Sequence, residues 1–321
     1  MKKIHLISTL IGLLAFSTIS KADLKVVTSI KPIHSLASYI MDGVGSPGLI
    51  VDGYNSPHNF QLKPSHAKML EQADIIFWVG EDLENFLEKP LDTIAKKAEK
   101  IELLEIKGIK KLKFRERNIF EEHDDHGHDA KKEEHDDHGH DAKKEEHDNH
   151  EGHSHGEYDP HIWLDPINAK VILNEITEHL IENDSKNAST YKSNLAKALA
   201  KIDKLIIDVI TETNTDLSYV VFHDAYQYYE NRFNVNILGA MTVNPDVMPG
   251  AEQIHEIHEI IEHDNVSCIL SEPQFNPDII KSIAKDTNVK TGVLDPLGAN
   301  LKPGKDLYFD LIRNMSASFN C

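Results

Sequence analysis

Residues 187–213 read NASTYKSNLAKALAKIDKLIIDVITET and contain neither glycine nor proline. Apolar residues recur along one stripe of this segment, at Leu195, Leu199, Ile202, Leu205, Ile206 and Val209. This spacing of three to four residues predicts a single long amphipathic helix. Because alternating strand and helix patterns lie on both sides of it, we expect a rigid helix over 185–214 that connects two α/β units.

Short apolar runs alternate with amphipathic stretches before this helix. Predicted strands occupy 24–30 (LKVVTSI), 48–52 and 74–79 (DIIFWV), and predicted helices occupy 31–41 and 65–72. Such alternation is typical of an α/β sandwich with a largely parallel sheet. We therefore predict an N-terminal lobe over 23–184, in which the chain becomes polar after Glu99.

The same alternation returns after the long helix. Predicted strands lie at 219–222, 235–238, 266–270 and 289–294, and predicted helices at 225–233, 251–262, 277–286 and from about 305 onward. We assign 215–321 to a C-terminal lobe. The expected fold class is α/β, with two α/β sandwich lobes joined by one long rigid helix. A cleft between two such lobes is a common place for a small ligand.

The first 22 residues have the pattern of a secretory signal peptide. Met1-Lys2-Lys3 is basic, an apolar run follows from Ile4 to Ile19, and we expect cleavage after Ala22. The run is short for a membrane span, and no later stretch has about 18 uninterrupted apolar residues. No cysteine near the cleavage site offers a point for lipid attachment, so we expect the periplasm as the location.

The chain has two cysteines, Cys268 and Cys321, and both belong to the part predicted to be exported. In an oxidising compartment such a pair favours a disulfide, which would attach the C-terminal tail to the body. The alternative is two free, buried thiols.

The formal net charge of −19 is concentrated in one segment. Residues 121–157 hold fifteen acids and four lysines, a net charge of −11, and leave −8 for the rest of the chain. The letters EEHDDHGHDAKK occupy 121–132 and again 133–144, and a degenerate third copy runs to Pro160. Apart from alanine, no apolar residue recurs there, so we predict a disordered loop. The acidic balance argues against nucleic acid as a partner.

Ten of the twenty histidines lie in this segment, next to carboxylates. Imidazoles in such surroundings bind borderline divalent cations such as Zn²⁺, Ni²⁺ and Cu²⁺, whereas the alternative is a merely solvating tract. We predict auxiliary weak metal sites at His123, His126, His128, His135, His138, His140, His147, His150, His153 and His155.

Three other histidines end or follow a predicted strand, where the cleft would be lined. They are His58 in NSPHNF (55–60), His161 in DPHIWLDP (159–166) and His223 in VVFHDAY (220–226). A single histidine of this kind is more often structural than a ligand. Three of them, from both predicted lobes and beside a metal-binding segment, favour a metal site. Neutral imidazoles suit Zn²⁺, whereas Mn²⁺ prefers sites richer in carboxylate.

The motifs of the chain resemble those of a known family. They are PHNFQLKPS (57–65), DPHIWLDP (159–166), FHDAYQYYENRF (222–233), SEPQFNP (271–277) and LDPLG (294–298). In this order they resemble the metal-binding proteins of ZnuA-type high-affinity zinc ABC importers. The resemblance implies two α/β lobes bridged by a long helix, with zinc held between them by His58, His161 and His223.

The same resemblance implies a role in transport rather than catalysis. The protein would capture Zn²⁺ as its transported ligand and deliver it to an ABC transporter permease in the inner membrane, where a separate ATPase supplies the energy. No phosphate-binding loop motif occurs in this chain, which agrees with an ATPase on another chain. We expect a monomer.

The fourth zinc ligand stays open at this point. Family members can use a carboxylate beside the first histidine, but that neighbour is Pro57 here. Manganese-selective relatives use an aspartate in a motif comparable to LDP (294–296), which makes Asp295 a candidate. Its alternative role is that of a turn or cap residue. Water is an equal candidate, and Glu272 stands behind both.

Two other classes of function fit parts of the sequence. An exported zinc enzyme would use the same three histidines with an activated water, and it would need a general base, as in H-E-x-x-H. The nearest string, HEIHEIIEH (255–263), has glutamate at both positions where the second histidine is required, and we expect its histidines to be exposed. A surface adhesin is the other alternative, against which the lack of a lipid anchor argues. For His34, His66 and His179, which lie in helical patterns, we expect structural or surface roles.

Overall fold

The computed structural model describes residues 23–115, 118–120, 156–245 and 247–321. The predicted signal peptide at 1–22 lies outside the described residues. So do nearly all of the predicted loop at 121–157 and all ten of its histidines. At its edge, the backbone N–H of Phe114 donates to the carbonyl of Glu157 over 3.2 Å.

The N-terminal lobe is built on a four-stranded parallel sheet in the order β2-β1-β3-β4. Its strands are β1 (Val26–Ile30), β2 (Gly48–Val51), β3 (Ile75–Trp78) and β4 (Glu99–Glu102), and its helices are α1 (Lys31–Ile40), α2 (Pro64–Glu71) and α3 (Glu81–Thr93). Every residue of β1 and β3 is buried, because these central strands are covered on both faces. All the strands and helices predicted before Glu99 are present.

The C-terminal lobe repeats this design, with the parallel order β6-β5-β7-β8. Its strands are β5 (Ser218–His223), β6 (Asn236–Thr242), β7 (Cys268–Ser271) and β8 (Lys290–Val293), and its helices are α6 (Gln227–Phe233), α7 (Ala251–His263) and α8 (Asp278–Thr287). In both sheets the second strand in the chain pairs on one side of the first strand, and the third and fourth strands follow on its other side. Each sheet therefore has a switch point between its two central strands, at whose carboxyl ends ligands commonly bind.

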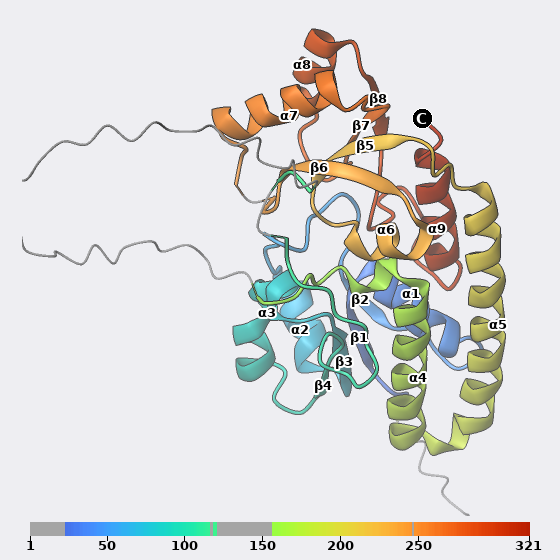
Figure 1. Cartoon of the computed structure of the whole chain (residues 1–321). Coiled ribbons are helices and arrows are strands. Elements are labelled where there is room, and N and C mark those ends of the chain that lie inside the picture. The colour runs from blue at the N-terminus through green and yellow to red at the C-terminus, as the bar shows by residue number, and fades with distance from the viewer. Residues whose placement is uncertain (1–22, 116–117, 121–155, 246) are drawn as a thin grey trace, which may run out of the picture.

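Three helices lie along the two lobes, as Figure 1 shows: α4 (Pro166–Asn183), α5 (Ala188–Glu212) and α9 (Leu307–Ser318). The 25 residues of α5 span roughly 37 Å at 1.5 Å per residue, enough to reach from the base of one lobe to the other. This confirms the predicted fold class, with two α/β lobes and a long connecting helix. In addition, α9 packs against both α1 and α5, so the connection is broader than one helix.

One apolar core runs from the N-terminal sheet through these helices to the inner face of the C-terminal sheet. Trp163 and Tyr308 are fully buried at the junction. The indole Nε1–H of Trp163 donates to the carbonyl of Pro296 over 2.8 Å, and the Tyr308 hydroxyl donates to the carbonyl of Trp163 over 2.9 Å. These bonds hold the two lobes against each other beside the three histidines predicted to bind metal.

Two elements of the N-terminal lobe were missed by the sequence patterns. β4 is an edge strand in which only Ile101 is buried, so its letters, EKIE, carry no apolar alternation. α3 contains Pro90 and has a non-helical backbone at Glu84, which interrupts its helical pattern. The stretch after Glu99 is therefore polar, as the sequence predicts, but part of it is still a strand.

The predicted disulfide between Cys268 and Cys321 is confirmed. Cys268 begins β7 in the centre of the C-terminal lobe, and Cys321 is the last residue of the chain, just after α9. The bond attaches the end of α9 to the sheet.

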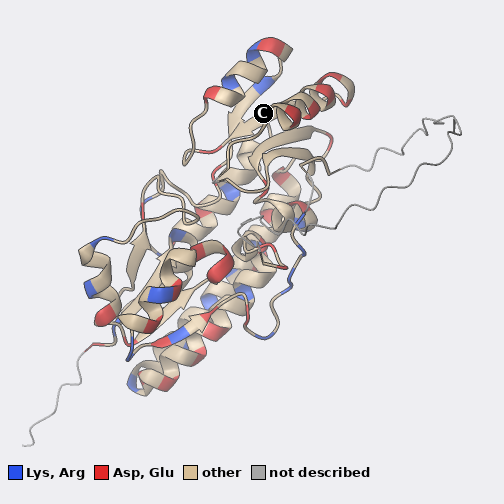
Figure 2. Cartoon of the chain, turned by 90° about the vertical axis from the view of Figure 1, so that its left-hand side faces the viewer, with Lys and Arg blue, Asp and Glu red and all other residues tan. Residues whose placement is uncertain are grey.

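Acidic and basic residues both occur along the helices of the two lobes (Figure 2). None of the helices among the described residues is long and apolar enough to cross a membrane.

Glu84 is a charged residue at the centre of the N-terminal lobe. It is fully buried, and its Oε2 accepts the backbone N–H groups of Val79 and Gly80 over 2.8 and 3.1 Å. Burial raises the pKa of this carboxyl to about 7, against these hydrogen bonds, which lower it. The folded protein therefore holds the proton at pH values where the unfolded chain has released it.

Replacement of Glu84 by glutamine is expected to stabilise the fold at pH 8. The free energy of unfolding of the wild type falls as pH rises from 4.5, the ordinary pKa of this carboxyl, to about 7, its pKa in the folded protein, because the unfolded carboxyl ionises first. The loss over this range is roughly 3 kcal/mol. Glutamine keeps the acceptor oxygen without the charge. Urea unfolding at pH 8 and pH 4.5 should show the gain at pH 8 only. Glu88→Gln, on the exposed side of the same helix, is the control, and a gain of equal size at both pH values would contradict the assignment.

Candidate metal centre

His58, His161 and His223 come from three separate segments and meet at the junction of the lobes. His223 is the last residue of β5, at the switch point of the C-terminal sheet. His161 precedes the short 3-10 turn Ile162–Leu164, and His58 lies in the irregular segment between β2 and α2. The topology thus brings together histidines that are separated by up to 165 positions in the sequence.

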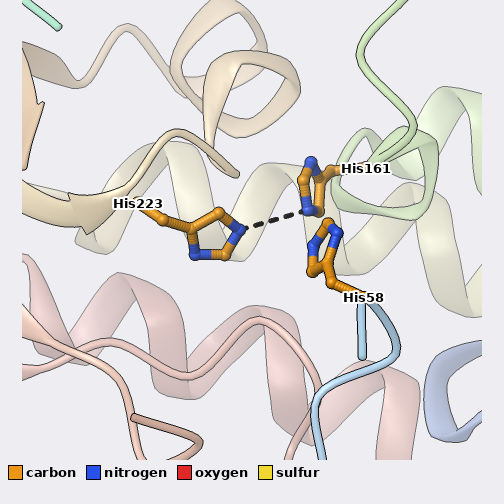
Figure 3. Close-up of side chains that lie close together, drawn as sticks. All are labelled: His58, His161 and His223. Carbon is orange, nitrogen blue, oxygen red and sulfur yellow. Dashed lines mark hydrogen bonds between the residues drawn. The ribbon is translucent and has the colours of Figure 1, made fainter. Parts of the chain in front are cut away.

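The three side chains are arranged as a metal site. One nitrogen from each ring lies within 4.8 Å of the others, and Figure 3 shows the rings facing a common point. The Nε2 atoms of His161 and His223 are 3.3 Å apart. A tetrahedral ion bound at about 2.0–2.1 Å places its ligand nitrogens roughly 3.3–3.4 Å apart, so this pair already has the spacing of two zinc ligands.

A carboxylate holds each of the two buried rings from behind. Asp159 Oδ1 lies 2.7 Å from Nδ1 of His161 and also accepts its backbone N–H, and Glu272 Oε1 lies 2.6 Å from Nδ1 of His223. An ionised carboxylate only accepts hydrogen bonds, so Nδ1 carries a proton in both rings and Nε2 is the nitrogen left for a metal ion. Outer partners of this kind orient metal-binding histidines and make them more basic.

Burial and charge affect the two rings differently. Burial lowers the pKa of His161 well below its ordinary value, so this imidazole is neutral over a wide range of pH. For His223, burial lowers the pKa, but the charge and hydrogen bond of Glu272, together with the charges of Asp224 and Asp159, outweigh it and the net shift is upward. Burial also raises the pKa of Asp159 to about 7, so its carboxylate is ionised on the alkaline side of neutrality.

Arg115 pairs with two of the acids that lie behind the site. Its guanidinium donates to Asp224, the neighbour of His223, over 3.0 Å, and to both oxygens of Glu230 over 3.1 and 2.8 Å. The sequence patterns did not identify Arg115, since only the fold brings it to these acids. Asp159 stands in a motif that the sequence analysis quoted, and its D-x-H spacing was the available signal for an orienting role.

The candidates for a fourth ligand have other partners. The carboxylate of Asp295 accepts the backbone N–H groups of residues 297–299 over 2.5–3.1 Å and the side-chain amide of Gln274 over 3.0 Å. The structure thus shows Asp295 organising its own loop and does not bring it into the group of three histidines. Glu272 lines the same small cavity as the histidines and is bonded to His223.

The remaining histidines of the described residues lie away from this site. In the string at 255–263, His255 and His263 are exposed and His258 is half-buried on α7. His34 is buried and bonds to the carbonyl of Pro47, and His66 accepts the backbone N–H of Lys63 at the start of α2.

Comparison with known proteins agrees with this geometry. The family model for the zinc-uptake complex component A, periplasmic (ZnuA), matches residues 26–320. The chain belongs to the ZnuA family. It is 48% identical over 300 residues to the high-affinity zinc uptake system protein ZnuA of Brucella abortus (strain 2308), a match that covers 91% of this chain and 90% of that protein.

Solved structures show the same fold. A crystal structure of ZnuA matches with a TM-score of 0.70 and 20% identity, over 92% of this chain and 100% of that one. The laminin-binding adhesin Lmb of Streptococcus agalactiae, in a mutant form, matches with a TM-score of 0.71 and 21% identity, over 92% and 98% of the two chains. At this identity the likeness concerns the fold alone.

Membership of the ZnuA family settles the class of function. The family consists of substrate-binding components of zinc uptake that work with an ABC transporter, and its members are not enzymes. The chain is therefore a zinc-binding transport component, and the zinc-enzyme alternative is excluded.

Removal of either orienting carboxylate is expected to weaken zinc binding. Asp159→Asn and Glu272→Gln keep the size of the side chain, but the new side chains have no negative charge with which to accept the Nδ1–H. Loss of such a partner typically lowers metal affinity by about 10–100-fold, and we expect a loss of this size here. Zinc affinity can be measured by competition with a chromophoric chelator. Glu262→Gln, on the exposed surface of α7, is the matched control. Unchanged affinity in both variants would contradict the orienting role.

Zinc affinity is expected to fall on acidification, beginning above the ordinary histidine pKa of 6.5. A proton competes with zinc for His223, and Glu272 raises the pKa of that imidazole. In Glu272→Gln this cause is removed, so the fall should begin at lower pH although affinity at pH 8 is weaker. The same competition assay from pH 8 to 5.5, corrected for protonation of the chelator, distinguishes the two profiles. Superimposable pH profiles would count against the coupling of these residues.

Proposed function

We propose that this protein captures one Zn²⁺ with His58, His161 and His223 and delivers it to the permease of an ABC transporter, which a separate ATPase drives. The observation that carries this proposal is the convergence of three imidazoles at the junction of the lobes, two of them held by buried carboxylates. We assign the fourth position to water, because the carboxylates of Asp295 and Glu272 are already engaged.

The ligand set favours zinc over manganese. Three neutral nitrogen donors suit a borderline cation that accepts tetrahedral coordination, whereas Mn²⁺ favours carboxylate and water oxygens. The 3.3 Å separation of two ligand nitrogens also fits short bonds to a small ion. The nearby carboxylates approach Nδ1 atoms, so they act as partners of the rings and leave the nitrogens as the donors.

The location and organisation of the chain follow from the same function. We propose a periplasmic protein that acts as a monomer, with 1–22 removed as a signal peptide. Its lobes are 23–184 and 215–321, with the connecting helix at 185–214. We also propose that the histidine-rich segment at 121–157 binds zinc weakly and raises its local concentration near the selective site.

The central test is the loss of tight zinc binding when one histidine is removed. His58→Ala, His161→Ala and His223→Ala should each lower affinity by more than about 100-fold, beyond the 10–100-fold typical of an orienting partner, because each change removes a direct ligand. A chelator that buffers free zinc keeps the weak sites of the histidine-rich segment empty, so the whole mature chain can be used. His255→Ala on α7 is the control. Tight binding that survives all three changes would refute the assignment.

A further inference from the structure

A second group of metal-binding side chains lies at the other end of the N-terminal lobe. Its residues come from α4 and β4, and Figure 1 shows both elements below the junction of the lobes. His179 is on α4, with Glu175 one turn before it and Glu182 one turn after it, so all three share one face of the helix. Glu99 is the first residue of β4. One ligand atom each of Glu99, His179 and Glu182 lies within 4.8 Å of the others.

The hydrogen bond of His179 fixes which ring nitrogen can bind a cation. Nε2 of His179 lies 3.2 Å from Oε1 of Glu175 and forms a hydrogen bond with it. Because an ionised carboxylate only accepts, Nε2 carries a proton, and Nδ1, which has no hydrogen-bond partner among the described residues, is the nitrogen that a cation can approach. A carboxylate behind the far nitrogen of an imidazole is the usual companion of a metal-binding histidine, and Asp159 and Glu272 have the same relation to the junction site.

The contact of Nδ1 with Glu99 is the second observation. Oε1 of Glu99 lies 2.8 Å from this nitrogen, yet Nδ1 forms no hydrogen bond among the described residues, because the oxygen lies off the direction in which the ring would point a proton. Two atoms with lone pairs repel each other at this distance unless a proton or a metal ion lies between them, and a proton on Nδ1 would point away from this oxygen. A metal ion bound at about 2.0–2.2 Å to both atoms would hold them roughly 3 Å apart.

The negative charge around His179 and the exposure of its neighbours are both compatible with a bound cation. Three glutamates surround one imidazole, and within the described part of the chain no lysine or arginine forms an ion pair with any of them. Asn183 donates to Oε2 of Glu99 over 2.9 Å and so positions that carboxylate. The side chains of His179 and Glu99 are 18% and 37% exposed, so an ion can reach them from solvent.

We propose that Glu99, His179 and Glu182 bind a second divalent cation of the zinc class, with Glu175 orienting the imidazole. Such an ion would tie α4 to the edge strand β4 and would stabilise the N-terminal lobe. One nitrogen and two partly exposed oxygens form a weaker site than three largely buried nitrogens, so it fills only after the junction site. This site is independent of the transport site and does not depend on its assignment.

Anomalous diffraction at the zinc edge tests the site directly. Crystals of the mature chain soaked in Zn²⁺ should show a peak beside Nδ1 of His179, and this peak should be absent in His179→Gln. Glu178→Gln, on an exposed face of the same helix, should retain it. A peak at the junction but none at His179 would overturn this proposal alone. A peak at His179 that persists in His179→Gln would also overturn it, since the imidazole would then not be a ligand.

A solution measurement supports the same distinction without a crystal. In His161→Ala/His223→Ala, which lacks the junction site, added Zn²⁺ should still raise the melting temperature, because an ion that binds only the folded state stabilises it. Adding Glu182→Gln, an exposed position whose change should not impair folding, should remove that increase, and adding Glu178→Gln should not. An increase that survives Glu182→Gln would assign the effect to other sites and contradict the proposal.

Discussion

The Nε2 atoms of His161 and His223 face each other at 3.3 Å, and the rest of the structure serves to hold them there. Each ring is fixed by a carboxylate at Nδ1, and each carboxylate is buried with it. The rings belong to different parts of the chain, so their spacing depends on the junction of the lobes. The buried Trp163, the long helix α5 and the C-terminal helix α9 make that junction a packed core.

Burial of a divalent cation requires negative charge nearby, because removing an ion from water is costly without compensation. Three neutral imidazoles supply none. Asp159 and Glu272 supply up to two negative charges directly behind the rings, and Asp224 and Glu230 lie farther back with Arg115 between them. Burial raises the pKa of Asp159, Asp224 and Glu230 to about 7, although the charge of Arg115 lowers the pKa of all three. The carboxylates behind the two rings are thus placed to balance the charge of a bound cation.

Much of the fold and the grouping of the three histidines could be predicted from sequence, for a physical reason. Buried parallel strands and amphipathic helices leave local patterns, and His58, His161 and His223 each stand in a recognisable motif. Partners made by topology leave no such pattern. Glu272 reaches His223 only because β5 and β7 are neighbours, and Arg115 reaches Asp224 across 109 positions. β4 was missed because it is an edge strand with one buried residue.

The same distinction explains why the sequence leaves the role of Asp295 open. An aspartate before a proline fits both a metal site and a loop, and the sequence does not show where the following backbone N–H groups point. In the structure three of them point at its carboxylate.

The fixed junction also bears on how an ion leaves the site. Separating the lobes would expose a continuous core, whereas His58 is half-buried in a segment with neither helix nor strand. Since exposing apolar core is costly, opening the site on the His58 side disturbs the least packing.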